Sequence, residues 1–72
     1  MKIQMIIRSN LGEFKSEIMS ITSEQYNGLK ELSKTFYLSG FELVTENGGF
    51  VVLPPEITKQ SILTIEIINE DV

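Results

Sequence analysis

A chain of 72 residues without histidine, cysteine or tryptophan has few routes to chemical catalysis. Histidine is the side chain whose charge changes near neutral pH and cysteine is the strongest protein nucleophile, so acid–base, covalent and zinc chemistry are all disfavoured. Six basic and ten acidic residues give a net charge of -4, which disfavours nucleic-acid binding because such a surface repels phosphate on average.

The length predicts a single domain over residues 1–72, close to the lower limit for a hydrophobic core without a disulfide or a metal. Stability must then come from packing, within one chain or between subunits. The absence of cysteine suits a reducing compartment, and the apolar run at the amino terminus is too short for a signal peptide or a membrane span. We therefore expect a cytoplasmic protein with no membrane partner.

The first two elements are predicted to be strands. Residues Lys2 to Arg8 alternate, with Ile3, Met5 and Ile7 on the apolar face. A turn over residues 9–12 leads to a second strand from Glu13 to Met19, in which Phe14, Ser16 and Ile18 share the face opposite Glu13, Lys15, Glu17 and Met19. The short connection predicts an antiparallel hairpin.

A helix is predicted next. Thr22 and Gln25 fit a capping box, in which each side chain bonds the other residue's backbone N–H. Gly40 fits a left-handed position after the last turn, with Phe41 meeting Phe36 across the helix end. Apolar residues recur at steps of three and four and indicate about four turns of amphipathic helix: Tyr26, Leu29, Leu32 and Phe36.

A second hairpin is indicated by the Asn47-Gly48 pair between two apolar runs, since this pair suits a two-residue type I′ loop. Such a loop sets Val44 opposite Val51 and Glu42 opposite Leu53. One face then carries Phe41, Leu43, Thr45, Phe50 and Val52, and the other carries Glu42, Val44, Glu46, Val51 and Leu53.

Pro54-Pro55 ends that strand because proline cannot donate to a ladder, and residues 55–59 can form one helical turn. The last strand is predicted from Ser61 to Ile68. The order is ββαβββ, which predicts an α+β two-layer sandwich with one helix packed on one face of a five-stranded, largely antiparallel sheet.

One helix covers only one face of such a sheet, so the other face is left with an apolar patch. A patch of this kind is typical of an interface. We expect the chain to bind itself or another protein there, as a homo-oligomer, through Ile6, Val44, Val51, Leu53, Ile62 and Ile68. The isoleucine-rich last strand offers a rival route if its edge is unpaired, although pairing of this strand within the monomer is favoured.

Other polar groups provide weaker candidates for a site. The pairs Glu13/Glu17 and Glu42/Glu46 share strand faces, yet neither has a third ligand or a positioned donor, so we interpret them as solvated. Tyr37 near two lysines is compatible with an anionic ligand or a peptide, but lysines also simply suit a helix C-terminus. No catalytic residue, metal site or cofactor is predicted.

The sequence thus favours a small non-enzymatic protein-interaction module that self-associates. Its size and its lack of catalytic groups are similar to those of small accessory proteins of phages and other mobile elements, although no motif carries this similarity. The alternative is a small-ligand-binding or sequestering protein with its site at a subunit interface.

Overall fold

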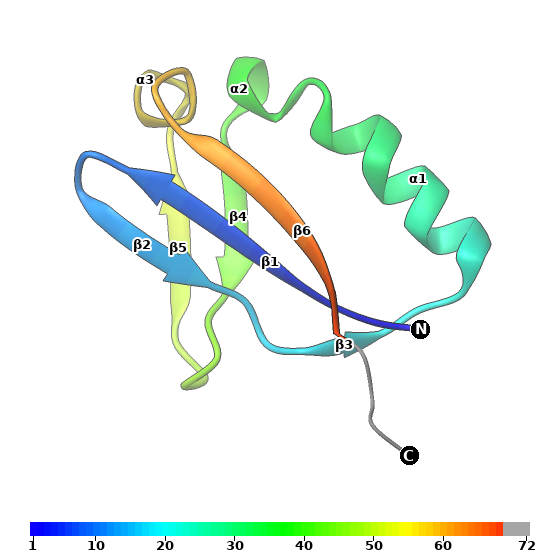
Figure 1. Ribbon diagram of the computed structural model, residues 1–72. Coiled ribbons are helices and arrows are strands. Elements are labelled where there is room, and N and C mark those ends of the chain that lie inside the picture. The colour runs from blue at the N-terminus through cyan, green and yellow to red at the C-terminus, as the bar shows by residue number, and fades with distance from the viewer. Residues whose placement is uncertain (69–72) are drawn as a thin grey trace.

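The computed structural model describes residues 1–68, and residues 69–72 lie outside the described part. Within that part the chain is α+β, with three helices and two antiparallel sheets of four and two strands, not one five-stranded sheet under one helix (Figure 1). In chain order the elements are β1 (Lys2–Ser9), β2 (Gly12–Lys15), β3 (Met19–Ser20), α1 (Ser23–Ser33), α2 (Phe36–Ser39), β4 (Phe41–Val44), β5 (Phe50–Leu53), α3 (Pro55–Thr58) and β6 (Ile62–Ile68).

The larger sheet is built around β1. Strand β6 pairs with it along its length, from Lys2 opposite Ile68 to Arg8 opposite Ile62. Strands β2 and β3 share the other edge of β1. The apolar side of β1 (Ile3, Met5 and Ile7) is buried, as its alternation predicts.

The predicted strand from Glu13 to Met19 is wrong in its second half, because a bulge divides it into β2 and β3. Strand β2 sets Lys15 opposite Ile6, whereas β3 sets Met19 opposite Ile3, so the chain between them contains one extra residue. An extra residue reverses the facing of all later side chains in a strand. Met19 therefore lies on the core side and Ile18 is exposed, the reverse of the prediction.

The second hairpin forms as predicted, but its register is shifted by one residue. Val44 lies opposite Phe50, not Val51. The Thr45 N–H bonds the Gly49 oxygen at 2.9 Å and the Gly48 N–H bonds the Thr45 oxygen at 3.0 Å, which closes a three-residue loop. Gly48 alone has a positive φ there, 84°, as expected for a type I turn followed by a glycine bulge.

This hairpin forms a second layer behind the larger sheet (Figure 1). It is joined to the bulge by backbone bonds, from the Glu46 N–H to the Lys15 oxygen at 3.0 Å and from the Glu17 N–H to the Val44 oxygen at 3.2 Å. Leu43 and Leu53 of the hairpin are buried. The hairpin thus supplies much of the cover that the prediction assigned to the helix.

The helical region begins as predicted, and both bonds of the capping box between Thr22 and Gln25 are present. The predicted continuous helix is wrong, however, because α1 ends at Ser33 and α2 starts at Phe36. The Ser33 and Thr35 hydroxyls bond carbonyl oxygens of the last turn of α1, at 2.9 and 3.2 Å, and so compete with its continuation. No residue of α1 is buried.

The break redirects the chain so that Phe36 becomes buried. Its ring meets that of Phe41 edge-on at 6.1 Å, and Gly40 between them has a φ of 77°, which confirms the predicted contact and the positive φ. The predicted turn after Pro54 is also confirmed, as α3. Among residues 1–68 no helix is long and apolar enough to cross a membrane.

Candidate interaction surfaces

The six residues predicted to form one exposed face are not brought together by the fold. Ile6 and Leu53 are buried, at 3% and 4% exposure, and Val51 and Ile68 are half-buried. Val44 and Ile62 are exposed but lie on different sheets. The prediction placed both hairpin strands in the main sheet and set their register one residue out, which turned Val51 and Leu53 toward the wrong side.

The outer face of the β4–β5 hairpin is the first apolar surface that the fold exposes. Val44 and Phe50 form one cross-strand pair on it, and Val52 lies opposite Glu42 in the next. Phe50 and Val52 are 62% and 60% exposed. The prediction missed both because it read the loop as two residues, although glycine is also the expected third residue of a three-residue loop.

The second surface is the free edge of β6, which pairs only with β1 among the described strands. On the β2 side of β1, the Met5 carbonyl oxygen accepts a bond from the Ser16 N–H, and the Met5 N–H donates to the Ser16 hydroxyl. Because bonding sides alternate along a strand, the even-numbered residues of β1 bond toward β6, and their partners on β6 are even-numbered too. Leu63, Ile65 and Ile67 therefore direct their N–H and C=O groups away from β1.

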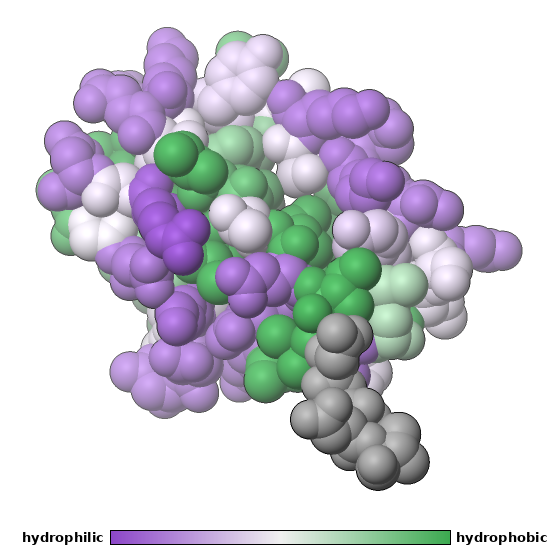
Figure 2. All heavy atoms as spheres, viewed as in Figure 1, coloured by the Kyte–Doolittle hydropathy of each residue, from purple (hydrophilic) through white to green (hydrophobic). Residues whose placement is uncertain are grey.

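No hydrogen bond within residues 1–68 occupies these outward groups. The strand is apolar apart from Thr64 and Glu66. Figure 2 shows apolar side chains running across the front of the molecule along the path of β6. Ile62 and Ile67 are exposed. An unpaired edge of this composition is a template for another strand.

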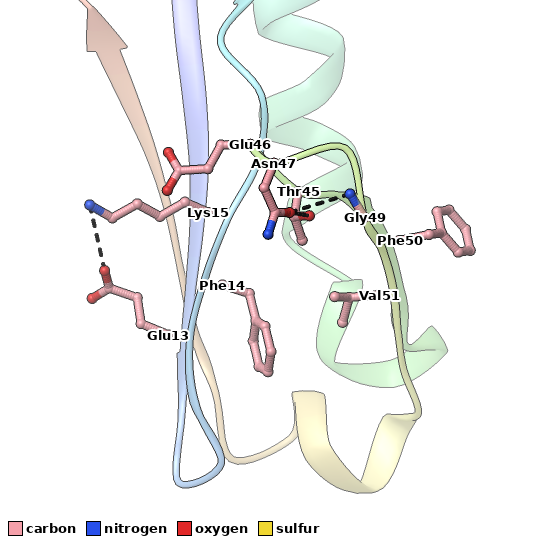
Figure 3. A pocket seen from close by; sticks show the side chains of 9 residues that line it. All are labelled: Glu13, Phe14, Lys15, Thr45, Glu46, Asn47, Gly49, Phe50 and Val51. Carbon is pink, nitrogen blue, oxygen red and sulfur yellow. Dashed lines mark hydrogen bonds and ion pairs between the residues drawn. The ribbon is translucent and has the colours of Figure 1, made fainter.

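The third surface is an open groove of about 430 Å³ between β2 and β5. Phe14 and Val51 point into it from the two sides (Figure 3), while Glu13 and Lys15 are ion-paired at 3.7 Å on its rim. Its size suits a small ligand. The lining residues are Glu13, Phe14, Lys15, Thr45, Glu46, Asn47, Gly49, Phe50 and Val51.

The carboxylates are dispersed. Glu13 also meets Arg8 at 2.8 Å, and the bulge separates it from Glu17. Glu46 accepts a bond from the Gln4 amide at 3.4 Å. Residues 1–68 contain no group of three or more aspartates and glutamates that could hold a metal ion.

The lysines near Tyr37 have other partners. Lys30 lies 5.5 Å from the ring centre of Tyr26, and Lys34 pairs with Glu31 at 3.0 Å. The Tyr37 carbonyl oxygen lies 3.3 Å from the Thr58 hydroxyl, which links α2 to α3. The structure therefore does not favour an anion site at Tyr37.

The chain matches no protein-family model, curated protein or solved structure. Among residues 1–68, the outer hairpin face, the free edge of β6 and the groove between β2 and β5 are candidate binding surfaces.

Proposed function

We propose that this protein is a small non-enzymatic protein-interaction module that self-associates in the cytoplasm. The observation that carries the proposal is the distribution of apolar side chains between core and surface. Phe50, Val52 and Ile62 are at least 60% exposed on sheet elements. By contrast, the buried apolar residues among residues 1–68 are Ile3, Met5, Ile6, Ile7, Phe36, Leu43 and Leu53.

A core of this size gives limited stability, because a small chain buries a smaller fraction of its surface than a large one. Contact with a second copy covers exposed side chains and adds roughly 25 cal/mol for each Å² of apolar surface removed from water. Self-association is thus a direct route to further stability for a chain that has no disulfide.

The non-enzymatic part of the proposal is supported by the residue types available. The chain has no histidine and no cysteine, and the bonds of Glu13 and Glu46 connect structural elements. The absence of cysteine also supports the cytoplasm as the compartment.

Native mass spectrometry and light scattering across micromolar to millimolar concentrations test the proposal. We expect a dimer or larger assembly that persists at high salt, because apolar contacts are not screened by ions whereas attraction between exposed charges is. A monomer at every concentration would contradict self-association. An assembly that dissociates as salt is added would show that charge, rather than the exposed apolar surface, holds it together.

A second candidate function is small-ligand binding or sequestration, which the groove between β2 and β5 favours. Phe14 and Val51 provide an apolar base, and Lys15 and Glu46 provide charge at the rim. The same mass spectra of gently purified protein test it, since a retained small molecule adds mass to each subunit. The added mass should be lost in the variant Val51→Arg, which places a long charged side chain in the groove, and be kept in Val52→Arg on the outer face.

A further inference from the structure

We propose that two copies of the chain pair their β6 strands edge to edge, antiparallel and centred on Ile65, so that the two larger sheets become one. This inference rests on the proposed self-association and names the surface and register that produce it. The outer hairpin face belongs to the other sheet and takes no part in this pairing.

The backbone of β6 supports this pairing. Leu63, Ile65 and Ile67 direct N–H and C=O groups outward, and within residues 1–68 these groups have no partner. Two identical antiparallel edges related by a two-fold axis exchange the same bonds in both directions. With the axis at Ile65, this residue meets Ile65 of the partner subunit, and Leu63 meets Ile67 of the partner subunit.

The side chains select the register. A two-fold axis at Ile65 pairs every residue of Ile62–Ile68 with a residue of the same segment in the partner subunit. Moving the axis to either neighbouring residue leaves some of these residues without a partner. An axis at Glu66 would also set two carboxylates directly opposite each other, which is unfavourable. With the axis at Ile65, Glu66 lies opposite the neutral Thr64 of the partner subunit.

The exposure of β6 fits the same register. Ile62 and Ile67 are 66% and 51% exposed in the monomer. The pairing sets Ile62 opposite Ile68 of the partner subunit, so that apolar side chains meet near both ends of the ribbon. Figure 1 shows α1 on the side of β6 away from β1, the side to which the sheet would extend. No residue of α1 is buried, and its Leu32 is 72% exposed, so α1 does not bury an apolar face within the described part of the chain.

Single cysteines test the register, because the natural chain has none and any disulfide must join two chains. Residues facing each other in a bonded antiparallel pair have Cα atoms about 5.5 Å apart, within disulfide range. We expect Ile65→Cys to form a covalent dimer under mild oxidation at least about tenfold faster than Ile62→Cys, because the proposed register holds the two copies of residue 62 about 20 Å apart.

The controls separate this inference from the proposed function. Ile62→Cys has the more exposed thiol, so random collision would favour it over Ile65→Cys. Phe50→Cys reports dimers formed through the outer hairpin face. An assembly in which Phe50→Cys or Ile62→Cys cross-links faster than Ile65→Cys would overturn the β6 pairing while leaving self-association intact. A chain that stays monomeric before oxidation would overturn both.

Discussion

The hydroxyl of Ser16 accepts a hydrogen bond from the backbone N–H of Met5 at 2.8 Å, in the middle of the edge where β1 meets the bulge. The same hydroxyl donates a hydrogen bond to the backbone carbonyl oxygen of Glu17 at 2.8 Å. The backbone carbonyl oxygen of Ser16 accepts a bond from the side-chain amide of Gln4 at 2.9 Å. Ser16 is buried. A short polar side chain thus satisfies a backbone donor that the bulge would otherwise leave unpaired.

Replacing Ser16 should therefore destabilise the fold. We expect Ser16→Ala to lower the free energy of unfolding by about 1–3 kcal/mol, since the buried Met5 N–H loses its acceptor. Urea denaturation measures the change. Ser20→Ala, at an exposed position of β3, serves as the control and should change stability by less than about 0.5 kcal/mol. Equal effects of the two substitutions would show that the hydroxyl of Ser16 is not required.

The register of the β4–β5 hairpin can be tested with two adjacent residues. Leu53 is buried and Val52 is exposed. We expect Leu53→Ala to cost about 2–4 kcal/mol of unfolding free energy and Val52→Ala less than about 1 kcal/mol. A two-residue loop would reverse this order, so thermal or urea unfolding of the two variants distinguishes the registers.

Two glycines should respond in opposite directions to alanine. A Cβ on Gly40 would lie 2.6 Å from the Leu53 carbonyl oxygen, and the φ of 77° is unfavourable for alanine, so we expect Gly40→Ala to cost about 2 kcal/mol or more. A Cβ on Gly28 of α1 meets nothing within 4 Å, so Gly28→Ala should stabilise by about 0.5–1 kcal/mol. Melting temperatures measure both, and a stabilising Gly40→Ala would contradict the described turn.

The capping box should control the start of α1. The Gln25 N–H bonds the Thr22 hydroxyl at 3.1 Å, and α1 has no buried residue to compensate for the loss of this bond. We expect Thr22→Ala to cost about 1 kcal/mol of helix stability, seen as faster amide hydrogen exchange in the first turn of α1. Ser23→Ala is the matched control. Exchange that is unchanged in Thr22→Ala would mean that packing, rather than the cap, holds this turn.

Local signals in the sequence determined much of the secondary structure. The alternation of β1, the capping box at Thr22, the positive φ of Gly40 and the turn after Pro54 depend on neighbouring residues, and all are present in the structure. The apolar character of β6 is likewise a property of its own residues. These signals act over a few residues and do not depend on where other elements lie.

Only the tertiary structure decided which faces are buried, because facing depends on register and one extra residue reverses it. The bulge at Ser16 turned Met19 inward, and the third loop residue of the second hairpin exposed Phe50 and Val52 in place of Val51 and Leu53. The β4–β5 hairpin lies outside the main sheet, in a layer behind it (Figure 1), and β6 pairs only with β1 among the described strands, which leaves its other edge open. The bulge and the arrangement of the two sheets result from long-range pairing, which no local pattern in the chain specifies, and together with the loop they determine which surfaces are exposed.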